Sequence, residues 1–332
     1  MTDLKAMRAA RFIMSLFLLS ALTGCMPSGL LITPVSTNRA LMEETLASES
    51  PLATTKIALI EVSGLILDAP QPQLLGEGEH PVSLLMEQLE KARHDSAVKA
   101  VVLRINSPGG AVTASELMHD EIVRFRKDTG RPVVAALMDV AASGAYYIAC
   151  ACDDIVAQRS SVTGSIGVIM QMFDLTGTLN KIGARSEAIT SGPNKAAGSP
   201  FETMTPEQRA LFQTMVDEMY NQFVDVVSAG RPKLTRERIV ELADGRVYTA
   251  GQALQNGLID RIATMHDTIA LAKQKVGAKS IRLVGYRRPV GYKPNYYAHA
   301  PTPGSGDVNL IKLDLPAWLR AASPQFMYLW VP

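Results

Sequence analysis

The chain has 332 residues, of which 47% are apolar and 20% are charged, so it can bury a large core. This balance excludes a disordered or collagen-like protein. The 33 basic and 32 acidic residues leave a net charge of +1, without the basic field that nucleic-acid binding requires. Beyond the N-terminus no apolar run is long enough for a membrane-spanning helix, which excludes a polytopic membrane protein.

The N-terminal segment has the pattern of an export signal. Three basic residues precede an apolar stretch over residues 12–22, which is too short to span a bilayer comfortably. The sequence Leu22–Cys25 that follows resembles the lipobox of bacterial lipoproteins, where the chain is cut before the cysteine and its sulfur receives a diacylglyceryl group. We expect residues 1–24 to be a signal peptide and Cys25 to be lipidated. An uncleaved signal anchor with an incidental cysteine is the alternative.

A lipid on Cys25 would attach the protein to a membrane of the bacterial cell envelope. Two or three acyl chains would anchor it stably, since each buried CH₂ contributes about 0.8 kcal/mol. Met26 follows, so no aspartate signals inner-membrane retention. The resemblance thus favours the periplasmic face of the outer membrane in a Gram-negative host, and the outer face of the cytoplasmic membrane otherwise. Residues 25–55, rich in Ser, Thr and Pro, are expected to form a tether.

Cofactor and metal chemistry find no support in the sequence. The remaining cysteines, Cys150 and Cys152, are too close for an unstrained disulfide and have no neighbouring Cys or His cluster, so we expect small buried residues. None of the five histidines stands in a recognisable catalytic motif, and there is no phosphate-binding glycine loop. We predict neither a cofactor nor a metal.

The hydrophobic periodicity predicts an α/β domain over residues 56–290. Short apolar segments alternate with amphipathic helical patterns, which is typical of a mainly parallel sheet with flanking helices. Residues 291–332 are expected to be a linker and a tail. The predicted strands are 56–62, 99–106, 132–138 and 154–157, and the predicted helices between them are 81–94 and 112–128.

The longest predicted helix covers residues 205–229. Thr205 and Gln208 form a capping box with a proline between them. An apolar stripe at helical spacing follows, and it has two interpretations, packing against the core or a subunit interface. A second capping box, Thr249 to Gln252, predicts the start of a short helix that ends at Gly257. A strand is predicted to follow over residues 258–262. The stripe consists of Phe212, Met215, Val216, Met219, Phe223 and Val227.

Three loops could carry chemistry. Asn106–Gly110 leads from a strand into a helix, and its paired glycines expose backbone N–H groups that suit an oxyanion, although a simple tight turn has the same sequence. In Ala141–Tyr147 the small neighbours leave the Ser143 hydroxyl accessible, although a helix N-cap serine would have the same pattern. In Ser191–Phe201, Lys195 has no adjacent carboxylate, so burial would favour its neutral, basic form. A surface lysine is the alternative.

Together with Thr163–Val168 and Ala253–Asp260, these loops resemble the SppA-type signal peptide peptidases in order and spacing. Those enzymes are Ser–Lys dyad proteases of the ClpP/crotonase superfamily. The resemblance extends from about Lys56 to Lys275 and is closest to the short, single-copy bacterial form. Ala145 departs from the family, which usually has a second glycine there. The resemblance implies a ClpP/crotonase-like fold.

The resemblance also implies roles for individual residues. Ser143 would be the nucleophile, Lys195 the general base, and Ser165 the residue that orients the lysine amine. The amides of Gly110 and Gly144 would form the oxyanion hole. The expected activity is that of a serine endopeptidase acting on signal peptide remnants or other unfolded hydrophobic peptides.

The family's short form builds a homo-oligomeric ring in which neighbouring chains complete each site. The resemblance therefore implies that Lys195 reaches the Ser143 of an adjacent chain, so within one chain the two side chains should lie well beyond hydrogen-bonding distance, about 3 Å. Two other functions compete. A crotonase-like acyl-CoA enzyme shares the fold, but export separates it from its cytosolic substrates. A catalytically inactive scaffold lipoprotein would have no need of the three polar residues.

Overall fold

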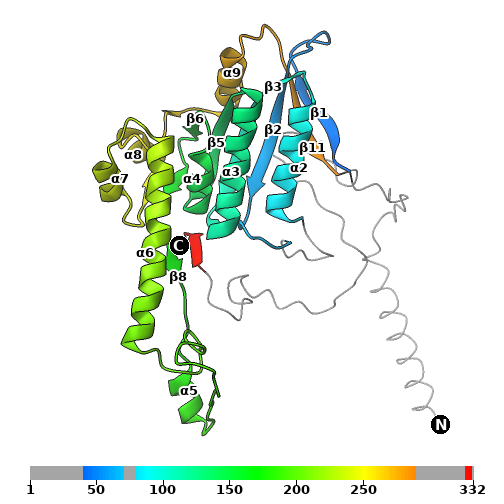
Figure 1. Cartoon of the computed structure of the whole chain (residues 1–332). Coiled ribbons are helices and arrows are strands. Elements are labelled where there is room, and N and C mark those ends of the chain that lie inside the picture. Colours follow the sequence, from blue (N-terminus) through cyan, green and yellow to red (C-terminus); the bar gives the residue numbers. More distant parts are fainter. Residues whose placement is uncertain (1–39, 71–78, 289–325, 331–332) are drawn as a thin grey trace, which may run out of the picture. The chain divides into compact units, whose positions relative to one another are not determined.

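The computed structural model describes residues 40–70, 79–288 and 326–330 (Figure 1). Its central sheet is mainly parallel, with strand order β1-β11-β2-β3-β5-β6-β10, and β7 and β9 branch from β5. The expected α/β fold is thereby confirmed. The strands of this sheet are β1 (Met42–Ser48), β2 (Lys56–Ser63), β3 (Val98–Ser107), β5 (Val133–Ala142), β6 (Asp154–Ala157), β7 (Val162–Gly164), β9 (Val247–Thr249), β10 (Arg261–Ile262) and β11 (Arg282–Arg287).

The central strands are apolar along their whole length because both faces of the sheet are covered. In β3, Val101, Val102 and Leu103 are all fully buried. Val102 pairs with Leu59 of β2 on one side and with Val134 of β5 on the other. These pairings set the register that brings the carboxyl ends of β3 and β5 to one edge of the sheet.

Helices cover the two faces of the sheet. Alternate residues of β2 enter two separate cores, since successive side chains of a strand point to opposite faces. Ile60 packs in the core that contains helices α2 and α3, which lie side by side in Figure 1. Ile57 packs on the other face against α9 residues such as Met265. The helices are α2 (Pro81–His94), α3 (Val112–Thr129), α4 (Gly144–Ala149), α5 (Thr176–Lys181), α6 (Pro206–Gly230), α7 (Arg236–Leu242), α8 (Ala250–Gln255) and α9 (Met265–Lys275).

Most of the predicted elements agree with the structure to within a few residues. Helix α2 has the predicted bounds, and α6 begins with the predicted capping box between Thr205 and Gln208. The second capping box, at Thr249, is also present. Over 258–262 a full strand was predicted, but only β10 pairs there. The residues before it form turns and bends directly after α8.

Two strands lie in segments that were expected to be a tether and a tail. Strand β1 falls within residues 25–55 and pairs antiparallel with β11 at the sheet edge. Lys56 ties it to the body through Glu43 (2.7 Å) and Asp95 (2.8 Å). Because most β1 side chains are exposed, the segment has no apolar alternation from which a strand could be predicted.

The second of these strands, β12 (Phe326–Leu329), falls within residues 291–332. It lies between β4 (Gly109–Ala111) and β8 (Ile169–Met170) in a separate three-stranded sheet, and it pairs antiparallel with both. Three of its four side chains are buried, so packing as well as strand pairing stabilises this short strand.

Within residues 40–70, 79–288 and 326–330, no helix is both long enough and apolar enough to cross a membrane. The expected signal peptide 1–24 and the expected lipidation site Cys25 lie outside the described residues.

Candidate active site

The candidate site lies at the junction where β5 ends and α4 begins. Ser143 stands at this junction with φ 56° and ψ −119°, a backbone conformation that non-glycine residues seldom adopt. Its amide donates to the Gly164 carbonyl (2.7 Å), and its carbonyl accepts from the Tyr147 amide (2.9 Å). A strained strand-to-helix turn of this kind presents a serine hydroxyl at the end of the sheet.

The Ser143 side chain does not cap the helix it precedes. Its Oγ is buried and has no hydrogen-bond partner among the described residues. Buried hydroxyls are normally paired, so an unpaired one calls for an explanation in terms of chemistry or of an absent partner. The N-cap alternative for this serine is thus not supported.

Ser165 lies close to Ser143 through strand pairing. Ala142 of β5 pairs with Gly164 of β7, so the two serines leave neighbouring parallel strands at the same level. Ser165 also has a positive φ of 49°, its amide donates to the Arg246 carbonyl (2.8 Å), and its side chain is nearly buried. The structure therefore brings these two predicted residues together.

The two predicted amides also converge. A Cβ placed on Gly144 would lie 3.3 Å from the Gly110 nitrogen, and one on Gly109 would lie 2.8 Å from the Gly144 nitrogen. A Cβ on Gly110 would lie only 1.9 Å from the Ile66 carbonyl oxygen, so only glycine fits there. The glycine pair thus lets β4 approach the first turn of α4, with backbone amides side by side.

Lys195 lies in a different part of the chain, in the turns that connect α5 to α6. Its side chain is exposed, and its amide closes a turn with the Gly192 carbonyl (3.1 Å). Gln208 Nε2 donates to the Pro193 carbonyl (3.0 Å), which ties this loop to the first turns of α6. Ser143 Oγ has no hydrogen-bond partner among the described residues, so within one chain Lys195 forms no hydrogen bond with Ser143, which agrees with the expected separation of the two side chains.

The segment 171–205 and the first half of α6 carry exposed apolar side chains. The apolar stripe of α6 enters the core only at its C-terminal half, where Phe223, Val224 and Val227 are buried. Core packing therefore accounts for half of the stripe only. Figure 1 shows α5 beyond the sheet, past the N-terminal end of α6. The exposed apolar residues are Phe173, Leu175, Ile182, Ile189, Phe201, Leu211 and Met215.

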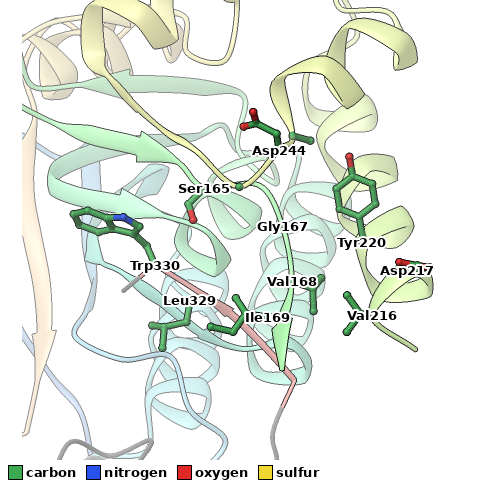
Figure 2. Close-up of a pocket in the computed structure, with 12 residues that line it drawn as sticks. Ser165, Gly167, Val168, Ile169, Val216, Asp217, Tyr220, Asp244, Leu329 and Trp330 are labelled. Carbon is green, nitrogen blue, oxygen red and sulfur yellow. The ribbon is translucent and has the colours of Figure 1, made fainter. Parts of the chain in front are cut away.

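A cavity of about 450 Å³ opens beside Ser165 (Figure 2). Its walls come from the β7–β8 connection, from α6, from the turn at Ala243–Gly245 and from the end of β12. The labelled residues in Figure 2 place Trp330 next to Ser165 and Tyr220 on the opposite wall. The lining residues are Ser165, Gly167, Val168, Ile169, Val216, Asp217, Tyr220, Ala243, Asp244, Gly245, Leu329 and Trp330.

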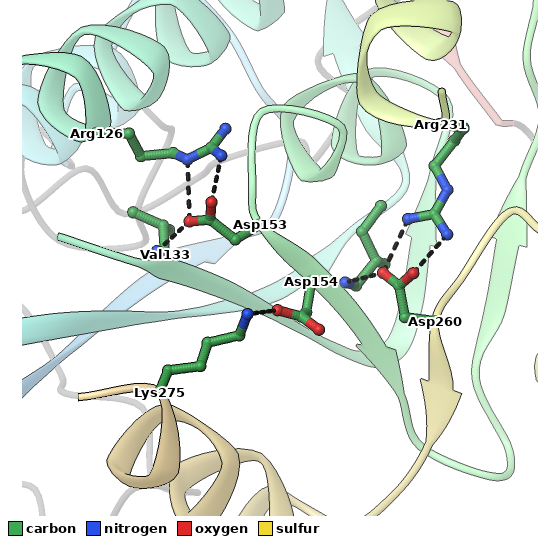
Figure 3. A network of polar contacts seen from close by, with 8 residues as sticks. Arg126, Val133, Asp153, Asp154, Arg231, Asp260 and Lys275 are labelled. Atoms are coloured by element: carbon green, nitrogen blue, oxygen red, sulfur yellow. Dashed lines mark hydrogen bonds and ion pairs between the residues drawn. The ribbon is translucent and has the colours of Figure 1, made fainter. Parts of the chain in front are cut away.

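Ion pairs surround β6, the strand that pairs with β5 on the side away from β3 (Figure 3). Arg231, after the end of α6, binds Asp260 through two hydrogen bonds of 2.7 and 2.8 Å, and Asp260 also accepts from the Ile155 amide (2.8 Å). Burial raises the pKa of Asp260, but the hydrogen bonds from Arg231 and Ile155 outweigh it and leave the pKa below its usual value. Arg126 binds Asp153 in the same region.

Cys150 and Cys152, in the turn that follows α4, are buried and free. Burial raises the pKa of Cys150 to about 12, and it raises that of Cys152 as well. Thiols of this kind are inert, in agreement with the prediction of small buried residues. The described residues contain no group of three His, Cys, Asp or Glu side chains that could hold a metal ion.

Sequence reasoning missed the segment Phe326–Trp330, which lies against the glycine strand β4. The one signal was the continuous apolar run over residues 326–331, in a C-terminal segment that is apolar at other positions as well. A short apolar run by itself does not distinguish a strand from an incidental cluster.

Comparison with known proteins places this site in context. Residues 125–279 match peptidase family S49. A putative signal peptide peptidase SppA of Enterococcus faecium is 34% identical over 247 residues, which cover 74% of this chain and 71% of that protein. A putative protease of Synechocystis is 36% identical over 64% of this chain and 71% of its own length. Protease 4 of Haemophilus influenzae is 33% identical over 68% of this chain, but only 35% of its own length is covered.

Proposed function

The chain belongs to peptidase family S49 and is an SppA-type serine peptidase, and from this premise we propose that Ser143 and Lys195 form its catalytic dyad. One observation carries the assignment of the nucleophile. Ser143 is strained, buried and without a hydrogen-bond partner in the described residues, and it precedes the Gly144 amide. A proton acceptor supplied from outside the chain would satisfy that hydroxyl.

The chemistry follows from these positions. Ser143 Oγ attacks a peptide carbonyl while the neutral Lys195 amine takes its proton. The carbonyl oxygen becomes an oxyanion and accepts hydrogen bonds from the amides of Gly110 and Gly144. The Lys195 ammonium then protonates the leaving amine, and the acyl group stays on Ser143. Water hydrolyses this ester by the same proton transfers, with Lys195 again as the base.

Ser165 is proposed to orient the lysine amine. Its side chain is nearly buried beside Ser143, and it lines the cavity that an approaching lysine would enter. A hydrogen bond from the amine to Ser165 Oγ would hold the nitrogen lone pair toward Ser143. Ser165 acts through Lys195 in this scheme and is therefore a positioning residue.

The base is proposed to come from an adjacent copy of the chain in a homo-oligomeric ring. Two features support this arrangement: the exposed Lys195 of one chain is not bonded to Ser143, and the segment that carries it has an apolar surface. Apolar patches of this kind mark interaction surfaces. A ring would also enclose the sites and admit extended peptides in preference to folded proteins.

We further propose that the peptidase is anchored in the bacterial cell envelope through a lipid on Cys25. The lipobox-like Leu22–Cys25 supports the lipid, and a relative named as a putative signal peptide peptidase supports the location in the cell envelope. The substrates would be signal peptide remnants or other unfolded hydrophobic peptides. Mass spectrometry of the mature N-terminus tests the anchor, because Cys25→Ser should abolish acylation. An unmodified N-terminus at another residue would exclude it.

Labelling with a fluorophosphonate, which phosphonylates activated serine hydroxyls with loss of fluoride, tests the nucleophile. The wild-type protein should be labelled at Ser143, and both Ser143→Ala and Lys195→Ala should lose the label. The inactive scaffold lipoprotein makes the opposite prediction, namely no labelling of any variant.

A further inference from the structure

A buried serine of helix α3 lies beside the proposed oxyanion hole. Ser115 is in the first turn of α3 and is fully buried. Its hydroxyl donates to the Ala111 carbonyl (3.0 Å), and Ala111 directly follows Gly110 in the chain. A Cβ placed on Gly144 would lie only 2.3 Å from the same hydroxyl oxygen. Ser115 is therefore bonded to the residue after one proposed oxyanion donor and in contact with the other.

Backbone hydrogen bonds fix the direction of the two donor amides. The Gly109 carbonyl accepts from the Ile66 amide (3.0 Å), and in a trans peptide the next N–H points the opposite way, so the Gly110 N–H points away from Ile66. The Ser143 carbonyl accepts the first hydrogen bond of α4, so the Gly144 N–H points out of the N-terminus of that helix. These bonds set the direction of each amide, but they do not set the distance between the two.

Ser115 lies where it can fix that distance. The point 2.3 Å from its oxygen is also 3.3 Å from the Gly110 nitrogen, so the hydroxyl and both amides surround one small volume. On one side Ala111 is held twice, since its amide donates to the Ile66 carbonyl (2.8 Å) and its carbonyl accepts from Ser115. On the other side the hydroxyl oxygen blocks any movement of Gly144 toward α3. Because protein interiors are close-packed, loss of this oxygen would leave room for the first turn of α4 to shift.

The hydrogen bond alone would not single out Ser115. Serines in helices often donate to the carbonyl four residues earlier. Ser228 of α6 does so with the Val224 carbonyl (2.9 Å), and it is only half-buried. Ser115 differs because it is fully buried and because its oxygen contacts a glycine at the start of another helix. Ser228 is thus a matched control for the hydrogen bond without the contact.

We propose that Ser115 is a positioning residue that sets the distance between the amides of Gly110 and Gly144 and so shapes the oxyanion hole. It acts through the two glycines and does not contact the substrate. The inference rests on the proposed peptidase function, since these two amides serve the acyl transfer to Ser143.

The variant Ser115→Ala removes the oxygen and introduces a residue with higher helix propensity, so the fold should be retained. Loss of one oxyanion donor lowers kcat by about 10²- to 10³-fold, and a misplacement of about 1 Å can cost about 100-fold. Because the variant keeps both donors and loosens only their spacing, we expect kcat to fall by roughly 10- to 100-fold, with KM changed by less than about twofold. A quenched fluorescent peptide, selected from a library for cleavage by the wild-type protein, measures both constants.

An aldehyde of the same peptide separates positioning from a loss of folded protein. Ser143 Oγ forms a bond to the aldehyde carbon, the hydroxyl proton passes to Lys195, and the aldehyde oxygen becomes the anion that the two amides bind. Its inhibition constant does not depend on the fraction of protein that is folded. For Ser115→Ala this constant should rise by the same factor as kcat/KM falls. Ser228→Ala should change neither value by more than about twofold.

The substitution Gly144→Ala tests the contact itself. In the wild-type background the new Cβ would lie 2.3 Å from the Ser115 oxygen, so the melting temperature should fall by roughly 5 °C or more. In the Ser115→Ala background the next atoms would be 3.2 and 3.3 Å away, and the same substitution should lower the melting temperature by less than about half as much. Equal decreases in the two backgrounds would exclude the contact.

The outcomes separate this inference from the function beneath it. If the wild-type protein cleaves the peptide and Ser115→Ala keeps kcat, the positioning role is wrong and the peptidase function stands. The same conclusion follows if kcat falls but the inhibition constant of the aldehyde does not rise, since Ser115 would then only support folding. If fluorophosphonate does not label Ser143 and the wild-type protein cleaves no peptide of the library, both are wrong.

Discussion

The Ser143 amide donates a 2.7 Å hydrogen bond to the Gly164 carbonyl, and this bond joins two strained turns. Ser143 and Ser165, on either side of it, are the two non-glycine residues with positive φ in the described part of the chain. Such conformations cost of order 1–3 kcal/mol each and persist where the surroundings enforce them, often at functional sites. Their occurrence on neighbouring strands supports the location of the proposed site.

Ser143→Ala should lower kcat/KM by about 10⁴- to 10⁶-fold, as is found when a nucleophile is removed from a unit of cooperating residues. It should not lower the melting temperature, because Ser143 Oγ has no hydrogen bond to lose within the chain. Turnover of a peptide and thermal unfolding measure the two effects. Substantial remaining turnover would exclude Ser143 as the nucleophile.

A mixture of Ser143→Ala and Lys195→Ala proteins should recover activity if each site combines residues of two chains. In an equal, randomly exchanged ring, about a quarter of the interfaces would join an intact serine to an intact lysine. Lys181→Ala is the matched control, since it removes an exposed lysine from α5 and should retain full activity. If the mixture stays inactive after demonstrated subunit exchange, the shared site is wrong.

Gly110→Ala should prevent the close approach of β4 to Ile66. The added Cβ would lie 1.9 Å from a backbone oxygen that cannot move alone, so we expect a loss of about 4 kcal/mol in the free energy of unfolding, or no folded protein. Gly177→Ala in α5 is the control, because nothing lies within 4 Å of its Cβ. Equal stability of the two variants in urea would contradict the tight packing described for β4.

The central strands and α6 were predictable because their signals are local. Apolar runs mark the strands, and the capping box at Thr205 marks the start of α6. The loops around Ser143 and Lys195 were singled out from their small residues and glycines, but the roles of the two residues came from the resemblance. Strands β1 and β12 were not predicted, because each is stabilised by pairing with a strand far away in the sequence. The ring of Tyr328 likewise contacts Tyr147 of α4 and Phe223 of α6. These contacts join segments far apart in the sequence, so no local pattern could predict them.

Asp260→Asn should destabilise the protein at pH 7 by about 2 kcal/mol, since it removes a charged partner of Arg231. The pKa of Asp260 is lowered in the folded state, so its contribution to stability is present above the unfolded pKa and is lost as the pH falls through the folded value. The difference between wild type and variant should therefore shrink below about pH 4. A difference that stays constant down to pH 2 would show that the charge is not involved.

Cys150 and Cys152 should resist iodoacetamide in the folded protein at pH 8. Both thiols are buried, and burial raises the pKa of Cys150 to about 12, so almost no thiolate is present. The peptide that contains both cysteines should be alkylated only after unfolding in guanidinium, which mass spectrometry can follow. Rapid alkylation of the folded protein would mean that α4 opens readily.

Helix α6 would also set a geometric tolerance for the proposed assembly. Its last residue, Gly230, packs so closely on α4 that a Cβ there would lie 2.5 Å from the Cys150 carbonyl oxygen. Its first turns hold the Lys195 loop through Gln208. A helix of 25 residues is about 37 Å long, so a tilt of about 5° at Gly230 would move the other end by about 3 Å. That displacement equals the length of a hydrogen bond, so in the proposed shared site the angle of α6 at Gly230 would decide whether the lysine of one chain can reach the serine of the next.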